Sequence, residues 1–251
     1  MARAVRFQME VRGQKLVGYS WGAGSPVLLV HGWGGSTAQF SPMVAPLLEA
    51  GHRVVALDLP AHGASSGHQT NVFEFRAALL ELARREGPFR AVVAHSLGSM
   101  AATLALGAGL RAERVVLVAP MTSFTFAVNE FARELGLSHR LKARATGEIV
   151  ASFGGERNLE LVRCASEMQT PLLVLHDEDD RRVPVQLGRE LAALWPRARY
   201  FETQGLGHKR LLGDSAVISR IVDFVEPAGV QVQPESGRFG VATTPPVRVA
   251  S

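Results

Sequence analysis

The sequence has little of what would indicate a disulfide-linked, zinc-stabilised or membrane-spanning protein. It contains a single cysteine, Cys164, among 251 residues, which excludes an intrachain disulfide and a cysteine-clustered zinc site. No apolar run approaches the roughly 20 residues of a membrane span, and the N-terminal residues include no apolar core of a signal peptide. We therefore expect a protein of a reducing compartment, with a cytoplasmic location as the default.

A large excess of charge of one sign is also missing. The 27 Lys and Arg residues exceed the 23 Asp and Glu residues by four, which gives a net charge of +4 at pH 7. The basic residues occur as scattered pairs, such as Arg84-Arg85 and Arg181-Arg182, and never form a stripe interleaved with aromatic residues. This pattern argues against a nucleic-acid partner. The histidines lack the spacing of metal ligands, so we expect no metal, and we expect no other cofactor either.

Short, mainly apolar runs are what the chain does have, and they predict strands that are buried on both faces of a sheet. After a predicted hairpin over residues 5–21, these runs are 26–30, 53–59, 91–94, 115–119 and 171–176. Predicted helices and a further strand complete the pattern, with helices at about 40–50, 71–86, 97–109, 184–195 and 211–225 and the strand at 199–203. Strands that alternate with helices of this length predict an α/β fold, with one mostly parallel sheet flanked by helices on both faces.

Two segments depart from this alternation. Residues 121–165 carry several phenylalanines, Phe153 among them, but no clear strand, and we expect a short helical cap over the carboxyl edge of the sheet. Residues 227–251 are rich in Pro, Gly, Val and Thr without helical periodicity, which predicts a partly disordered or surface-lying tail with no catalytic role. Residues 1–226 would then form one domain.

A serine stands where a predicted strand turns sharply into a predicted helix. In Ala94-His95-Ser96-Leu97-Gly98, the residues two positions to either side of Ser96 are small, so strand and helix can approach each other closely. This is the pattern of a nucleophile elbow. Ser96 is the candidate nucleophile, and the alternative is that it only caps the helix that begins at Leu97.

A serine hydroxyl needs a base, and that base needs a group that orients it. His208 lies on the loop after strand 199–203, and an imidazole suits this task because it exchanges protons near neutral pH. Asp180 is the preferred orienting acid, with Asp179 and Asp177 as alternatives in the same acidic loop. The loop could also be a solvated helix cap. The order serine, aspartate, histidine, each after its own strand, predicts that the three meet at one sheet edge.

A glycine-rich loop, residues 31–35 with the sequence His-Gly-Trp-Gly-Gly, follows the first buried strand. Such a loop exposes backbone N–H groups where negative charge develops on a tetrahedral intermediate, so we expect the N–H groups of Trp33 and Leu97 to form an oxyanion hole. A phosphate-binding loop is the alternative, but its G-x-G-x-x-G or Gly-Lys-Ser/Thr signature is missing. His31 and His95 are expected to have structural roles.

Residues 1–226 resemble the α/β-hydrolase superfamily. Besides the glycine-rich loop and the Ser96 turn, the resemblance is carried by three motifs: the loop Asp58–Ser65, the sequence Asp180-x-x-Val183-Pro184, and the pair Gly207-His208. The chain departs from the family pattern at Ala94 and Ala61, where glycine is common, and at Asp177, which replaces the glycine of His-Gly-x-x-Asp-x-x-Val-Pro.

The resemblance implies a serine hydrolase that forms an acyl-enzyme on Ser96, and a carboxylesterase of small to medium carboxylic esters is the expected activity. A thioesterase, a carbon–carbon bond hydrolase, a peptidase, a cofactor-free perhydrolase or an acyltransferase would use the same triad. A non-catalytic relative that binds a ligand or a partner protein is the remaining alternative. Trp33, Met121 and Phe124 are expected to line the substrate pocket.

Overall fold

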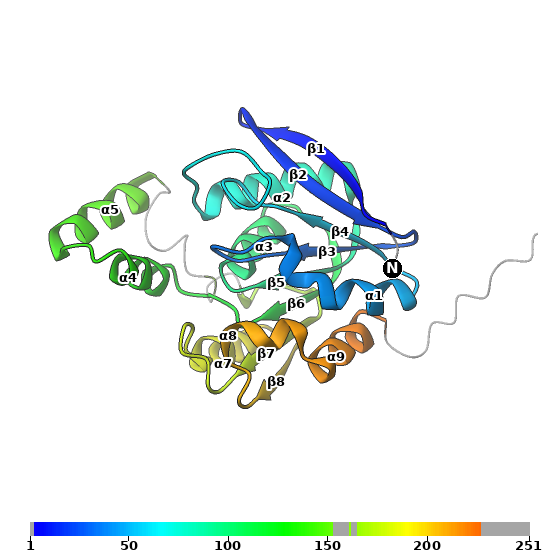
Figure 1. Ribbon diagram of the computed structural model, residues 1–251. Coiled ribbons are helices and arrows are strands. Elements are labelled where there is room, and N and C mark those ends of the chain that lie inside the picture. Colours follow the sequence, from blue (N-terminus) through cyan, green and yellow to red (C-terminus); the bar gives the residue numbers. More distant parts are fainter. Residues whose placement is uncertain (1–2, 153–160, 162–164, 227–251) are drawn as a thin grey trace, which may run out of the picture.

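Eight strands form one sheet in the computed structural model, which describes residues 3–152, 161 and 165–226 (Figure 1). The strands are β1 (Val5–Val11), β2 (Gln14–Trp21), β3 (Pro26–Val30), β4 (Arg53–Leu57), β5 (Phe89–His95), β6 (Ala112–Val118), β7 (Leu172–Asp177) and β8 (Ala198–Thr203). They lie in the order β1-β2-β4-β3-β5-β6-β7-β8. The pairs β1–β2 and β2–β4 are antiparallel, and the other neighbouring pairs are parallel.

Helices cover both faces of this sheet. They are α1 (Ser41–Glu49), α2 (Val72–Glu86), α3 (Leu97–Gly107), α4 (Phe124–Glu134), α5 (His139–Ser152), α7 (Val185–Leu194), α8 (Gly207–Arg210) and α9 (Ser215–Val225), with short 3-10 helices η1 (Thr37–Phe40) and η3 (Leu211–Gly213). Successive strand residues alternate between the faces. In β3, Val27 and Leu29 pack in the layer of α1 and α9, whereas Leu28 and Val30 pack in the layer of α2 and α3.

The observed elements confirm the predicted fold class, and the alternation of buried runs with amphipathic helices explains why. The clearest difference is at the predicted helix 211–225, which is divided into η3 and α9. The Asp214 carboxylate accepts hydrogen bonds from the backbone N–H groups of Ala216 and Val217, both at 3.0 Å. This side-chain cap starts a new helix at Ser215, because it satisfies N–H groups that the preceding turn does not.

The described part of the predicted cap consists mainly of the helices α4 and α5. Figure 1 shows α4 and α5 at one end of the molecule, with α5 farther from the sheet than α4. Phe153 and the predicted tail 227–251 lie outside the described residues. Within the described ranges, no helix combines the length and the apolar character that crossing a membrane requires.

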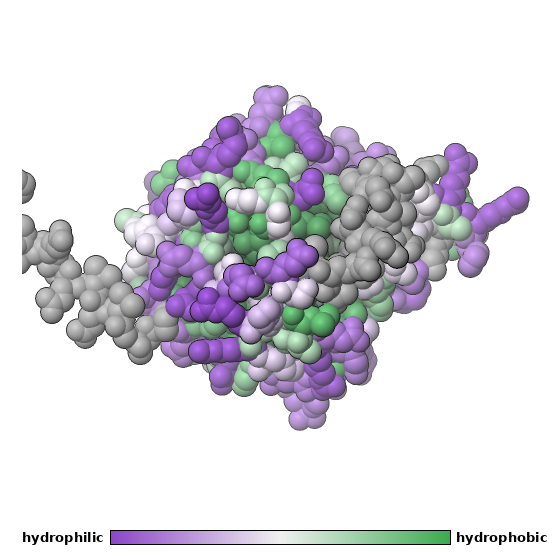
Figure 2. Space-filling model, turned by 180° about the vertical axis from the view of Figure 1, so that it is seen from behind, coloured by the Kyte–Doolittle hydropathy of each residue, from purple (hydrophilic) through white to green (hydrophobic). Residues whose placement is uncertain are grey.

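The surface of the described residues carries few large apolar side chains. Seen from behind, the margins of the molecule are mainly hydrophilic, and apolar residues gather near the middle of that face (Figure 2). The markedly exposed large apolar residues in the described part of the chain are Val5, Trp33, Phe131, Leu135, Leu141 and Leu194. Three of them lie on or between α4 and α5, and a fourth, Trp33, contacts α4 through its ring. Apolar exposure therefore concentrates around the cap.

Candidate active site

Ser96 occupies a strained turn between β5 and α3. Its backbone has φ 55° and ψ −125°, a region that residues with a side chain rarely adopt and that clusters at functional sites. Two glycines let neighbouring backbone approach this turn. A Cβ added to Gly98 would lie 2.4 Å from the carbonyl oxygen of His31, and one added to Gly32 would lie 2.9 Å from the Cβ of Ser96. Ala94, fully buried, fills the position where the family usually has glycine.

The three side chains predicted from separate loops form one hydrogen-bonded chain. Ser96 Oγ lies 3.1 Å from His208 Nε2, and His208 Nδ1 lies 2.7 Å from Asp180 Oδ2. In the tautomer that serves both contacts, His208 Nδ1–H donates to the carboxylate and Ser96 donates to Nε2. The Ser96 and Asp180 residues are each 9% exposed, so little water competes for these contacts.

The Asp180 carboxylate is held by further donors. Its Oδ1 accepts hydrogen bonds from the backbone N–H groups of Arg182 at 2.8 Å and Val183 at 2.9 Å. Burial by itself raises the pKa of Asp180, but the hydrogen bonds from His176, His208 and Val183 outweigh it and leave the pKa far below its usual value. The carboxylate therefore stays ionised at neutral pH, as a partner for an imidazolium must.

The two alternative acids make different contacts. Asp177 accepts hydrogen bonds from the backbone N–H groups of Leu206 and Gly207, and Asp179 accepts one from that of Gly205 at 2.9 Å. Of the three aspartates, Asp180 is thus the one whose carboxylate meets the His208 ring. All three nevertheless contact the loop that carries His208.

The glycine-rich loop after β3 packs against the start of α3. A Cβ added to Gly32 would lie 3.4 Å from the backbone nitrogen of Leu97, so the loop passes directly beside Ser96 and the first turn of the helix. Among the described residues, neither the backbone N–H of Trp33 nor that of Leu97 has a hydrogen-bond partner. Two unpaired donors next to a serine hydroxyl are what an oxyanion hole requires.

Two histidine rings brace this loop. His31, buried, lies with Nδ1 2.8 Å from the Gly32 carbonyl oxygen, while its Nε2 accepts a hydrogen bond from the backbone N–H of Leu59 at 2.9 Å. His62 Nε2 accepts a hydrogen bond from the backbone N–H of Gly34 at 2.9 Å. The residues on both sides of Trp33 are therefore fixed by side chains.

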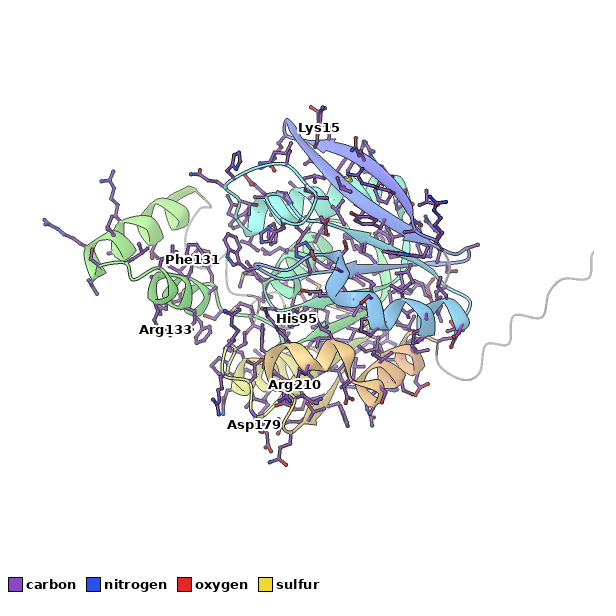
Figure 3. The ribbon with its side chains drawn as sticks, viewed as in Figure 1. Lys15, His95, Phe131, Arg133, Asp179 and Arg210 are labelled. Carbon is purple, nitrogen blue, oxygen red and sulfur yellow. The ribbon has the colours of Figure 1, made fainter. Side chains whose placement is uncertain are left out.

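His95, next to Ser96, contacts the backbone of His208 and makes no hydrogen bond to the Ser96 hydroxyl. Its Nε2–H donates to the His208 carbonyl oxygen at 2.9 Å, and the two rings lie 4.7 Å apart. Figure 3 shows His95 near the centre of the molecule, close to the sheet. Burial, aided by the proximity of His208, lowers the pKa of His95 to about 3. Its ring is therefore neutral near neutral pH.

The neutral rings of His31 and His95 predict a loss of stability in acid. Burial lowers the pKa of His31 from 6.5 to about 4, and that of His95 from 6.5 to about 3, whereas both take up protons at about pH 6.5 in the unfolded chain. Their contribution to the free energy of unfolding is complete above pH 6.5. It falls by ~1.4 kcal/mol per pH unit for each ring as pH drops from there toward the folded pKa values.

Urea unfolding at a series of pH values between 7 and 4.5 measures this slope. In each of the variants His31→Gln and His95→Gln, the free energy of unfolding should fall less steeply as the pH drops. The variant takes up about one proton fewer on unfolding, because glutamine does not titrate. A wild-type decline that both variants reproduce unchanged would contradict the assignment of neutral rings.

A cavity of about 270 Å³ opens in front of the Ser96 hydroxyl. Its walls are mainly apolar and come from the glycine-rich loop, the start of α2, the elbow, α4 and the loops of Asp180 and His208. The lining residues include all those predicted to bind substrate or to form the oxyanion hole: Trp33, Leu97, Met121 and Phe124. In the described part of the chain, no group of three or more His, Cys, Asp or Glu side chains is arranged to hold a metal ion.

Sequence reasoning did not single out several residues of this cavity. Val72 and Phe73 come from the N-terminus of α2, which follows a loop at the carboxyl edge, so its position in the chain could have indicated them. Ala127 and Val128 lie at helical spacing between Phe124 and Phe131, two phenylalanines of the predicted cap, and these four residues present one face of α4 to the cavity. In Figure 3, Phe131 lies on α4, and its ring packs edge-on against Trp33 at 5.2 Å.

Comparison with known proteins gives partial sequence matches. Residues 25–136 match the family model described as "alpha/beta hydrolase fold". A serine hydrolase-like protein of Danio rerio is 42% identical over 72 residues, which span 28% of this chain and 22% of that protein. A pimeloyl-[acyl-carrier protein] methyl ester esterase of Vibrio parahaemolyticus is 34% identical over 107 residues, which span 42% of this chain and 40% of that protein. The matches therefore cover less than half of these relatives.

Comparison with solved structures extends the likeness over nearly the whole chain. The crystal structure of an esterase from Rhodococcus sp. superposes with a TM-score of 0.71 at 21% sequence identity, covering 91% of this chain and 100% of that one. At this identity the likeness concerns the fold. Together with the strand order and the match over residues 25–136, it identifies this chain as a protein of the α/β-hydrolase fold.

Proposed function

We propose that the protein is a serine hydrolase, and that it is a carboxylesterase acting on small to medium carboxylic esters. The observation that carries this proposal is the hydrogen-bonded chain Asp180–His208–Ser96 at the wall of an apolar cavity. Two supporting observations are the unpaired backbone N–H groups beside Ser96 and the strained backbone of that residue. Strain of this kind persists only where the surrounding structure enforces it.

In the proposed reaction, Ser96 Oγ attacks the ester carbonyl carbon while His208 Nε2 takes the hydroxyl proton. The negative charge on the carbonyl oxygen is stabilised by the N–H groups of Trp33 and Leu97, and the charge on the imidazolium by Asp180. His208 then returns the proton to the leaving alcohol, which leaves an acyl-enzyme. Water, deprotonated by His208, attacks the acyl carbon and releases the carboxylic acid and the free serine.

The cavity is the basis for the proposed substrate size. At about 270 Å³ it is slightly smaller than the range of roughly 300–1,000 Å³ typical of sites that bury drug-sized ligands, and its walls offer an acyl chain mainly apolar contacts. Among the described residues that line it, the acidic and basic side chains other than His208 are those of Glu130 and Arg182. Glu130 is paired with Arg133 at 2.8 Å. A short or medium acyl group therefore fits the cavity better than a long chain.

Filling the cavity should shift the preference toward shorter acyl groups. Ala127 lies on the cavity wall in α4, so Ala127→Phe places a ring in the space for the acyl chain. We expect kcat/KM for p-nitrophenyl octanoate to fall about tenfold relative to p-nitrophenyl acetate, since a buried clash of this size costs on the order of 1–3 kcal/mol. The measurement is a chain-length series of p-nitrophenyl esters from acetate to palmitate.

Ala143→Phe is the matched control, because Ala143 is exposed on α5 and does not line the cavity. An unchanged chain-length profile for Ala127→Phe in a folded protein would remove this cavity as the acyl site. The same series tests the wild-type protein, and no turnover of any ester in it would count against the carboxylesterase proposal.

Other reactions use the same arrangement of groups, and their products separate them. Thioester substrates of matched acyl length distinguish a thioesterase, and a panel of carbon–carbon bond substrates distinguishes that class of hydrolase. Product analysis with an added alcohol acceptor distinguishes an acyltransferase, because the acyl group then appears as a new ester instead of free acid. A carboxylesterase gives free acid in each ester reaction.

A further inference from the structure

Asp177 is a buried carboxylate at the end of β7 that the proposed reaction does not use. Its Oδ2 accepts hydrogen bonds from Thr203 Oγ1 at 2.6 Å and from the backbone N–H of Leu206 at 3.0 Å. Its Oδ1 accepts hydrogen bonds from the backbone N–H groups of Gly207 at 2.8 Å and Asp179 at 3.0 Å. Four donors thus converge on one side chain that is 0% exposed.

The segment that Asp177 binds leads directly into His208. Leu206 and Gly207 are the two residues before the histidine, and Gly205 and Gly207 both have positive φ, of 80° and 63°. Glycine-rich turns have many accessible conformations, so without external contacts this segment would leave the ring of His208 poorly fixed. The carboxylate removes that freedom because it binds two successive backbone N–H groups.

A second contact fixes the backbone on the other side of His208. His95 Nε2–H donates to the His208 carbonyl oxygen at 2.9 Å. Asp177 and His95 therefore hold the chain immediately before and immediately after the Cα of the histidine. Neither residue lines the cavity, so a contact of either with substrate is not expected.

The four contacts that Asp177 makes require a side chain that accepts hydrogen bonds. Burial by itself raises its pKa, but the hydrogen bonds from Thr203, Gly207, Leu206 and Asp179 outweigh burial, and the pKa lies below its usual value. The side chain is therefore an ionised carboxylate facing four donors. Asparagine would turn an NH₂ group toward two of these donors, and a buried donor left without an acceptor is costly.

We infer that Asp177 is a positioning residue that, together with His95, holds His208 Nε2 within reach of the Ser96 hydroxyl. The inference rests on the proposed function, since it assigns Asp177 a role in that same site. The family pattern has glycine at this position, which has no side chain that could bind the loop, so these contacts are a feature of this chain. The carboxylate acts through the backbone of Leu206 and Gly207 and does not meet the substrate.

Asp177→Asn tests this inference. We expect kcat for p-nitrophenyl butyrate to fall about 100-fold with KM changed less than twofold, because small displacements of a catalytic group cost about this much and the cavity itself is unaltered. The matched control is Glu178→Gln, a neighbouring exposed carboxylate, with kcat expected to stay within twofold. An Asp177→Asn variant that is folded and keeps the wild-type kcat would overturn the inference.

A second measurement does not depend on activity. The proton that His208 Nδ1 shares with Asp180 should give a downfield ¹H resonance in the wild-type protein, which shifts upfield or broadens in Asp177→Asn and not in Glu178→Gln. This measurement separates the two proposals. An inactive wild-type protein with these spectra would contradict the proposed esterase activity and leave the positioning role of Asp177 supported. An active wild-type protein whose spectrum is identical to those of Asp177→Asn and Glu178→Gln would contradict the positioning role alone.

Thr203→Val tests the same inference if the Asp177→Asn variant does not fold. It removes one of the four donors, the hydroxyl at 2.6 Å, and leaves the carboxylate in place. We then expect the same pattern at smaller size, with kcat lowered about threefold to tenfold, KM unchanged and the downfield resonance shifted. A folded Thr203→Val protein with wild-type kcat and spectrum would contradict the inference.

Discussion

Replacement of Ser96 by alanine is expected to abolish ester hydrolysis, lowering kcat for p-nitrophenyl butyrate by about 10⁴-fold or more. The loss is this large because no acyl-enzyme can form without the hydroxyl, and only binding and the oxyanion hole remain to accelerate direct attack by water. The measurement is the steady-state rate of purified protein, with far-UV circular dichroism and thermal unfolding to show that the variant is folded.

Ser99→Ala is the matched control for this experiment. Ser99 lies one turn further along α3, is buried, and donates its hydroxyl hydrogen to the Ala94 carbonyl oxygen at 3.1 Å, away from the cavity. Its loss should cost some stability and leave kcat within about threefold of wild type. Equal rates for wild type and Ser96→Ala would show that the hydrolysis, if any, takes place elsewhere or by other means.

Asp180→Asn has the second-largest expected effect, a fall in kcat of about 10⁴-fold with little change in KM. An amide that donates to His208 Nδ1 forces the proton onto Nε2, so the ring can no longer accept the proton of Ser96. The amide also cannot stabilise the imidazolium that forms during the reaction. Rates for p-nitrophenyl butyrate near neutral pH measure the effect.

The neighbouring variant Asp179→Asn decides between the acids of this loop. Asp179 is exposed, its carboxylate accepts only the backbone N–H of Gly205 among the contacts of the described residues, and it does not meet His208. We expect kcat to stay within about fivefold. Should Asp179→Asn cost as much as Asp180→Asn, the orienting acid would have been assigned to the wrong residue.

The architecture could be predicted from the sequence because its signals are local. A strand buried on both faces needs a continuous apolar run, and a surface helix needs an amphipathic period. The order of elements therefore follows from the pattern of apolar residues along the chain. Ser96 could be found for the same reason, since the elbow requires small residues at fixed positions on either side. The loops of Asp180 and His208 follow because parallel strands bring their carboxyl ends to one edge.

The departures from the family pattern needed coordinates to be understood. Ala61 stands where glycine is common, and its φ of 59° explains that preference, because glycine adopts positive φ without strain. The contact between His95 and the His208 carbonyl joins residues 113 positions apart, so no local sequence pattern predicts it. The Asp-x-x-Val-Pro spacing favours Asp180 over Asp177 and Asp179, but the direction in which each side chain leaves this short loop is visible only in the structure.

The cavity walls illustrate a third level of difficulty. Met121 and Phe124 could be proposed because they follow β6 directly, whereas Ala127 and Val128 depend on how α4 lies over the sheet. The packing of Phe131 against Trp33 sets that placement in part, and it joins the cap to the glycine-rich loop. Tertiary contacts of this kind are not encoded in periodicity.

Labelling with a fluorophosphonate probe tests the central claim most directly, because the probe reacts only with a serine whose hydroxyl is activated by a neighbouring base and whose product is held by oxyanion donors. The account predicts one phosphonyl group per wild-type molecule, located on Ser96 by peptide mass spectrometry, no labelling of Ser96→Ala, and strongly slowed labelling of His208→Ala. A folded wild-type protein that stays unlabelled, or that is labelled at another residue, would contradict it and favour a protein that binds a ligand or partner without catalysis.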